Sequence, residues 1–193
     1  MIISLTGFMG CGKSSVGRKL SELLCCPFMD LDAEIEARCG CTVAEIFAER
    51  GEAEFRMLEK ETLKDILETD GRVLEISPSS STPACKNQEH PSNERPQMIL
   101  ALGGGAVMTP ECEEMVHGKT VCVYLRTSVD ELVARLSGES AGRPLLNTTD
   151  LRTRILDLMS KRTSTYERVA HLVIDTDGKT IDQAASEIAE KVV

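Results

Sequence analysis

The feature that most constrains the fold of this chain is a glycine-rich turn between an apolar run and an amphipathic segment, close to the N-terminus. The apolar run covers residues 2–5, the turn reads Gly-Phe-Met-Gly-Cys-Gly-Lys-Ser over residues 7–14, and Val16, Leu20 and Leu23 follow at helical spacing. A strand, the pattern G-x-x-x-x-G-K-S and a helix in this order predict a phosphate-binding loop. We therefore expect the chain to bind a nucleoside triphosphate.

The residue types in this loop suit a phosphate ligand. Glycine lets backbone N–H groups converge on an anion, and the start of the following helix adds unpaired donors and partial positive charge. Lys13 is placed to reach the outer phosphates, and the Ser14 hydroxyl is placed to hold Mg²⁺. A chance glycine-rich turn is the alternative, but such a turn would not be expected to carry lysine and serine in register after a strand.

Composition narrows the class of protein. The chain has 193 residues, of which 41% are hydrophobic, and a net charge of −9. The length favours one α/β domain, and the acidic balance argues against a nucleic-acid or anionic-membrane surface. No run approaches the roughly 18 apolar residues of a membrane span. Because the first strand follows Met1 directly, we expect a cytoplasmic protein without a signal peptide.

Cys25-Cys26 and Cys39-x-Cys41 are spaced closely enough to be candidate metal ligands. Their spacing fits no common zinc pattern, and no histidine lies nearby in the sequence. Small buried hydrophobic residues are the preferred interpretation.

Strand-like and helix-like segments alternate along the chain, which favours a parallel sheet covered by helices on both faces. Further strands are expected at 27–29, 73–76, 98–102, 121–125 and 172–174, and further helices at 33–38, from Thr42, and at 52–69, 110–116, 128–136, 151–165 and 181–192. Thr42 with Glu45 and Ser128 with Glu131 have the spacing of N-terminal caps, and Thr109 precedes a proline suited to a first helical position. We expect 98–102, rather than 73–76, to enter the sheet.

Residues 77–97 stand apart from this alternation. They contain four of the seven prolines and three successive serines, without apolar periodicity. This composition predicts an exposed, mobile loop, which we interpret as a solvated insertion rather than a lid.

Two acidic residues follow the second expected strand. Asp30 ends that strand, and Asp32 comes two residues later. In an extended stretch both side chains would point to the same side, near Lys13. One carboxylate could then hold a metal-bound water while the other accepts a hydrogen bond from a substrate hydroxyl. Capping of the helix that follows is the alternative role for these residues.

Taken together, the motifs of this chain resemble the shikimate kinase family from residue 2 to about residue 175. The resemblance is carried by residues 7–14, Asp30-Leu31-Asp32, Gly51-Glu52-x-Glu54-Phe55-Arg56, residues 102–107 (Leu-Gly-Gly-Gly-Ala-Val), Arg143-Pro144-Leu145-Leu146 and Lys161-Arg162. The phosphate-binding loop identifies only a superfamily. The two aspartates, the Phe-Arg pair and the triple glycine together point to shikimate as the acceptor.

The resemblance implies phosphorylation of the 3-hydroxyl of shikimate by ATP, with Mg²⁺ as cofactor. The residues implied to bind ATP are Gly10, Cys11, Gly12, Lys13, Ser14, Ser15, Arg135 and Arg143. Ser14 would ligate Mg²⁺ directly and Asp30 through water. Arg135 would lie against adenine, and Arg143 would close over the phosphates from a mobile lid at about 137–149.

For the acceptor, the resemblance implies that Asp32 bonds shikimate hydroxyls and orients or deprotonates the attacking one. Arg56 and Arg162, each of which alone looks like a surface arginine, would clamp the carboxylate. The amides of Gly103, Gly104 and Gly105 would support the ring. Lys13, Asp32 and Arg143 are thus the implied catalytic residues.

The implied fold is a three-layer α/β/α P-loop kinase domain over residues 1–193, with a five-stranded parallel sheet of order 2-3-1-4-5. The insertion at 77–97 departs from the family pattern, as does a cysteine at position 11 of the loop. We expect a monomer. A kinase of another small acceptor, such as gluconate or a nucleoside monophosphate, and a binding module that has lost catalysis are the two rival hypotheses.

Overall fold

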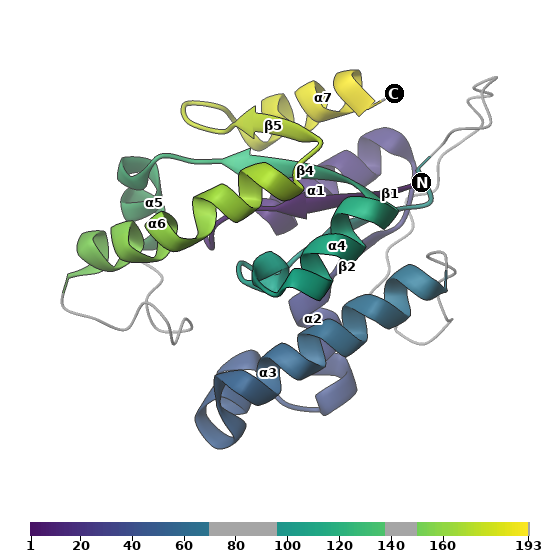
Figure 1. Cartoon of the computed structure of the whole chain (residues 1–193). Coiled ribbons are helices and arrows are strands. Elements are labelled where there is room, and N and C mark those ends of the chain that lie inside the picture. Colours follow the sequence, from purple (N-terminus) through teal and green to yellow (C-terminus); the bar gives the residue numbers. More distant parts are fainter. Residues whose placement is uncertain (70–95, 138–149, 193) are drawn as a thin grey trace.

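The computed structural model describes residues 1–69, 96–137 and 150–192. In chain order the elements are β1 (Ile2–Thr6), α1 (Lys13–Leu24), β2 (Phe28–Asp30), α2 (Leu31–Cys39), α3 (Val43–Glu68), β3 (Met98–Ala101), the 3₁₀ helix η1 (Ala106–Met108), α4 (Pro110–Lys119), β4 (Thr120–Arg126), α5 (Val129–Leu136), α6 (Leu151–Val169), β5 (Leu172–Asp175) and α7 (Ile181–Val192) (Figure 1). The expected strand at 73–76, nearly all of the insertion at 77–97 and the expected lid from residue 138 onward lie outside the described residues.

The five strands form one parallel sheet of order β2-β3-β1-β4-β5, as expected. The run expected at 98–102 forms β3 and lies between β1 and β2, which confirms its place in the sheet. The carboxyl ends of the three strands β1, β2 and β3 lead into the glycine-rich loop, Asp30 and the triple glycine. Parallel pairing therefore brings these three motifs to one edge of the sheet.

Helices cover both faces of the sheet, so successive strand residues enter two different cores. In β1, Ile2 packs in a core with α3 and α4, whereas Ile3 and Leu5 pack in a core with α1 and α7. Figure 1 shows α7 and α4 on opposite sides of the strands. A strand buried on both faces reads as a continuous apolar run, which explains why β1 and β3 are recognisable in the sequence.

The helix starts follow the expected caps in two of three cases. Thr42 forms a full capping box with Glu45, and the Ser128 side chain accepts a hydrogen bond from the Glu131 amide. Thr109 precedes Pro110 at the start of α4 as expected, but it makes no capping bond, and its buried hydroxyl has no partner among the described residues. Proline at the first helical position removes one unpaired N–H group, and α4 begins without a side-chain cap.

One detail of the helices agrees with expectation and another differs. The short helix expected from Thr42 and the helix expected from Glu52 are separated by a kink at Gly51, with φ of 80°, although both carry the label α3. Leu23 of α1 is 44% exposed. The buried stripe of α1 consists of Val16, Gly17, Leu20 and Ser21, and Leu23 falls to one side of it.

The closely spaced cysteines Cys39 and Cys41 are partly buried and pack against the core that contains α2 and α3, in keeping with a hydrophobic role. Among the described residues, no helix is both long and apolar enough to cross a membrane.

Candidate active site

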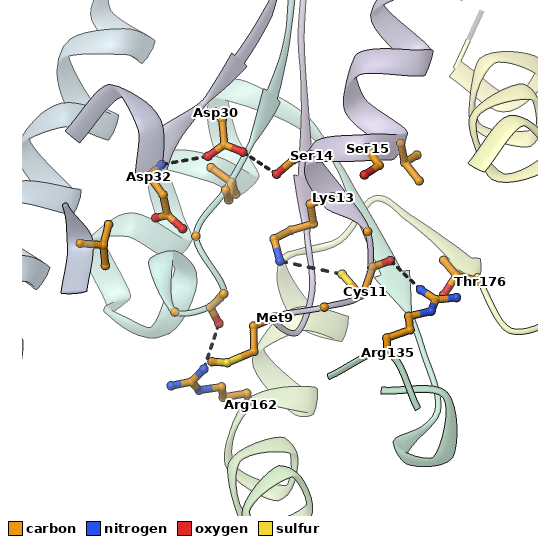
Figure 2. A pocket seen from close by; sticks show the side chains of 18 of the residues that line it. Met9, Cys11, Lys13, Ser14, Ser15, Asp30, Asp32, Arg135, Arg162 and Thr176 are labelled. Atoms are coloured by element: carbon orange, nitrogen blue, oxygen red, sulfur yellow. Dashed lines mark hydrogen bonds between the residues drawn. The ribbon is translucent and has the colours of Figure 1, made fainter. Parts of the chain in front are cut away.

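A cleft of about 960 Å³ opens at the carboxyl edge of the sheet. The predicted residues that line it are Gly10, Cys11, Gly12, Lys13, Ser14, Ser15, Asp30, Asp32, Arg56, Gly103, Gly104, Gly105, Arg135 and Arg162. Figure 2 shows Lys13, Asp32 and Arg162 reaching it from different elements. Arg143 is outside the described residues. Motifs that lie far apart in the sequence thus meet in one cavity.

The glycine-rich loop presents its lysine from the first turn of α1. Gly12 caps α1 in a left-handed conformation, with φ of 98°, which a side chain would disfavour. The Lys13 ammonium donates to the carbonyls of Gly7 and Phe8, both at 3.0 Å. The side chain of Cys11 is buried, and its amide donates to the Phe8 carbonyl at 3.2 Å. The lysine is therefore folded against its own loop, next to the space where a phosphate would enter.

Asp30 caps the helix that follows it, which was the alternative role, and also contacts the serine of the glycine-rich loop. Its Oδ2 accepts a hydrogen bond from the Ser14 hydroxyl at 2.5 Å, and its Oδ1 accepts one from the Asp32 amide at 3.1 Å (Figure 2). It thereby caps α2 while it lies beside the loop serine. The pair supplies two oxygen ligands in contact, the donor type that Mg²⁺ prefers.

Asp32 lies in the first turn of α2, not in an extended stretch, because the cap at Asp30 starts the helix at Leu31. The same-side argument from strand geometry was therefore wrong, although both aspartates line the cleft. Oδ1 of Asp32 is buried without a partner among the described residues. Burial, followed by the Asp30 carboxylate, raises the pKa of Asp32, while the charge of Lys13 opposes this shift.

Arg56 reaches the cleft from α3, held between two glutamates. Its Nη1 donates to Oε2 of Glu59 at 2.6 Å, and its Nη2 donates to Oε1 of Glu52 at 3.1 Å. Glu59 is 2% exposed, and burial raises its pKa to about 7, against the opposing charge of Arg56. Sequence reasoning missed Glu59. Its position three residues after Arg56, on the same helical face, was the available signal.

The triple glycine leaves room for these side chains. A Cβ atom on Gly103 would lie 2.5 Å from Oε1 of Glu59 and 2.7 Å from Oδ1 of Asp32, and one on Gly105 would lie 2.5 Å from Nη2 of Arg56. Oε1 of Glu59 is likewise buried and unpartnered within the described part of the chain. Two carboxylate oxygens with free acceptor capacity therefore converge over Gly103.

Two further arginines complete the lining. Arg162 is 8% exposed and donates through Nη1 to the Gly104 carbonyl at 3.2 Å, so it is not the surface arginine that its sequence alone suggests. Arg135 donates to Glu131 through Nε at 2.9 Å and to the Cys11 carbonyl at 3.4 Å. The cleft thus has Arg162 at the triple glycine and Arg135 at the glycine-rich loop.

Residues after β5 were missed by sequence reasoning. They line the cleft on the side of Arg135 and comprise Thr176, Lys179, Thr180, Ile181 and Ala184. Their signal is positional: they follow the last parallel strand, whose carboxyl end must point to the same edge. Phe47 and Phe55 of α3, with ring centroids 4.8 Å apart, also line it and were not predicted.

Comparison with known proteins agrees with this geometry. A family model described as shikimate kinase matches residues 9–90 and 88–193. A shikimate kinase from Bordetella avium is 38% identical over 98% of this chain and 78% of its own length, and one from Thermus thermophilus is 33% identical over 98% of this chain and 89% of its own. The structure of a shikimate kinase from Acinetobacter baumannii in complex with shikimate superposes with a TM-score of 0.82 at 31% identity, over 99% of this chain and 92% of that one.

Proposed function

This chain belongs to the shikimate kinase family, so that its reaction is the ATP-dependent phosphorylation of shikimate, and we propose that the cleft between Lys13 and Arg162 carries it out. The observation on which this proposal rests is that a phosphate-binding loop and a site with Asp32, Arg56 and Arg162 share one cavity. Phosphoryl transfer depends mainly on positioning and charge neutralisation, and both halves of the cleft supply these.

In the nucleotide half, Lys13 leaves its two loop carbonyls and binds the β- and γ-phosphates, which offer it stronger, charged acceptors. The amides of the loop through Ser15 add further donors, and Arg135 lies against the adenine. Arg143, outside the described residues, is proposed to close over the phosphates, which would exclude water from the reacting group.

Ser14 and Asp30 fit a magnesium ion, because their oxygens are already in contact at the base of the loop. Ser14 would bind the ion directly and Asp30 through a water molecule. The chemistry that Mg²⁺ supplies when bound is neutralisation of phosphate charge.

In the acceptor half, Asp32 accepts a hydrogen bond from the attacking 3-hydroxyl and takes its proton as phosphoryl transfer proceeds. Its unpartnered oxygen has the free acceptor capacity that this role needs, and its raised pKa makes it a better base than an exposed aspartate. Arg56 and Arg162 bind the shikimate carboxylate, because a guanidinium can form two parallel hydrogen bonds with it. The amides of residues 103–105 support the ring.

The rival hypotheses fit less well. A gluconate or nucleoside monophosphate kinase would not be expected to combine the two aspartates, Arg56 and the triple glycine. A module that has lost catalysis should have lost Lys13, Asp32 or an acceptor arginine, and all are present. We further propose a cytoplasmic monomer that needs no nucleic acid or membrane, in line with the net charge of −9.

The test is ADP release from ATP and Mg²⁺ with shikimate, against quinate, gluconate and nucleoside monophosphates, with phosphorus NMR to identify the product. Shikimate-dependent release with phosphate on the 3-hydroxyl is the expected result. Release with another acceptor alone would leave the phosphate-loop chemistry and overturn the acceptor assignment. ATP binding without turnover for any acceptor would favour the inactive module.

A further inference from the structure

The carbonyl of Gly104, in the middle of the triple glycine, is held from one helix by two side chains one turn apart. Arg162 Nη1 donates to it at 3.2 Å, and the Tyr166 hydroxyl donates to the same oxygen. Both side chains come from α6. Arg162 lines the cleft, whereas Tyr166 does not, so the tyrosine has no direct place in the chemistry proposed above.

The side chain of Tyr166 is held in place for this hydrogen bond by its surroundings. It has no exposed surface, and its ring packs against that of Tyr124 with centroids 5.3 Å apart. Burial raises the pKa of Tyr166, so the phenol keeps its proton and remains a donor throughout the working range of pH. A buried, packed donor constrains the position of its acceptor more strongly than an exposed one, because water cannot replace it.

The opposite side of Gly104 is also constrained. A Cβ atom at this position would lie 3.3 Å from the amide nitrogen of Met9, so the turn passes close to the glycine-rich loop. The chain at Gly104 therefore lies between α6 and that loop, and its carbonyl direction is fixed by α6.

The direction of the Gly104 carbonyl also sets the direction of the Gly105 N–H group. The peptide group is planar, and none between described residues is cis, so the N–H of Gly105 points opposite to the Gly104 carbonyl, away from Tyr166. Within the described residues this N–H forms no hydrogen bond. Gly105 itself lines the cleft beside Arg56. An N–H left free at the cleft is a donor available to a bound ligand.

We propose that Tyr166 is a positioning residue for the acceptor: by holding the Gly104 carbonyl, it aims the free Gly105 amide at the bound substrate. This inference rests on the proposed assignment of the acceptor half of the cleft. It gives α6 a second contribution to acceptor binding, in addition to Arg162, and one that does not touch the ligand.

The test compares Tyr166→Phe with Tyr124→Phe, since each removes one hydroxyl from the same pair of packed, buried rings. The wild type is assayed first, so that failure of the proposed function, seen as no shikimate-dependent ADP release, is separated from failure of this inference. We expect Tyr166→Phe to raise the KM for shikimate about fivefold, the effect of one lost hydrogen bond, with the KM for ATP within twofold of the wild type. Tyr124→Phe should leave both constants near the wild type.

A spectroscopic readout keeps the test independent of turnover. The Gly105 amide resonance should shift on addition of shikimate in the wild type and shift less in Tyr166→Phe. An unchanged KM for shikimate, equal increases for ATP and shikimate, the same increase in Tyr124→Phe, or an unaltered Gly105 response would each overturn the proposal.

Discussion

Arg56 is bound to Glu59 by only one of the two carboxylate oxygens. Nη1 of Arg56 donates to Oε2 at 2.6 Å, while Oε1 is buried and accepts from no described group. The free oxygen lies 2.5 Å from the position that a Cβ atom on Gly103 would occupy, and Oδ1 of Asp32 lies 2.7 Å from the same position. Arg56, which we propose binds the substrate, is therefore oriented by the carboxylate of Glu59. One oxygen of that carboxylate has no hydrogen-bond donor among the described residues.

Glu59 should make stability depend on pH. Its folded pKa of about 7 lies above the ordinary value of 4.5, so its favourable contribution is fully present below pH 4.5 and is lost as the pH rises through 7. The glutamine in Glu59→Gln does not titrate, so this variant does not lose the contribution. The free energy of unfolding of the variant minus that of the wild type should therefore increase between pH 4.5 and 8 by an amount on the order of 2–3 kcal/mol.

Urea unfolding at pH 5, 6, 7 and 8 measures this difference. Glu52→Gln, which removes the more exposed partner of Arg56, is the matched control. A difference between Glu59→Gln and wild type that stays constant across this range would show that the carboxylate is charged at all these pH values.

Lys13→Ala should lower kcat on the order of a thousandfold, because the transferring phosphoryl group loses a charged donor aimed at it. The control is Lys19→Ala on the same helix, where the ammonium pairs with Asp182 at 2.9 Å on the surface. Turnover is measured by coupled ADP release. If Lys13→Ala turns over at a rate near that of Lys19→Ala, the loop lysine does not act on phosphate.

Arg162→Ala should raise the KM for shikimate by about 10- to 100-fold, the effect of losing a charged hydrogen-bond partner of a carboxylate. ATP binding should change little, because Arg162 lies at the triple glycine. Lys161→Ala, whose side chain is 66% exposed, controls for loss of a neighbouring positive charge. Equal effects of Arg162→Ala on both substrates, measured by initial rates, would contradict a carboxylate clamp.

Gly103→Ala should impair the acceptor site by steric contact alone. The added methyl would meet Glu59 and Asp32 oxygens at 2.5 and 2.7 Å, so at least one carboxylate must move. We expect a drop in kcat/KM for shikimate of at least about tenfold. Gly118→Ala in α4 is the control: nothing lies within 4 Å of its added Cβ, and helix propensity should raise stability by up to about 1 kcal/mol. Wild-type kinetics for Gly103→Ala would mean that the positions of the Glu59 and Asp32 carboxylates beside Gly103 do not matter for the reaction.

Much of the fold was predictable from local patterns in the sequence. β1 and β3 are continuous apolar runs because both faces of the sheet are covered, and the Thr42 and Ser128 caps act through contacts within one helical turn. The exposure of Leu23 was not predictable in this way. The packing partners of α1, which lie elsewhere in the chain, decide it.

The site was predictable from local sequence only where adjacent residues form a complete binding element. The glycine-rich loop does so, because its residues are adjacent. Arg162 taken alone has the sequence features of a surface arginine, because its contact with Gly104 lies 58 positions away in the chain. The geometric argument for Asp32 was wrong, since the helix begins at Leu31, two residues earlier than that argument assumed. Glu59 and Tyr166 act on other site residues. The spacing of Glu59 from Arg56 is a local signal for its role, whereas the contact of Tyr166 with Gly104 lies 62 positions away.

The position of β1 in the sheet has a consequence for synthesis on the ribosome. β1 is made first, but Ile2 pairs with Met98 of β3 on one side and with Thr120 of β4 on the other. Long-range pairings of this kind are slow to form and leave strand edges exposed meanwhile. The central strand therefore remains unpaired at least until residues 98–101 have been made. A nascent chain that has not yet emerged through Arg126 cannot complete the nucleotide site, whatever its N-terminal motif.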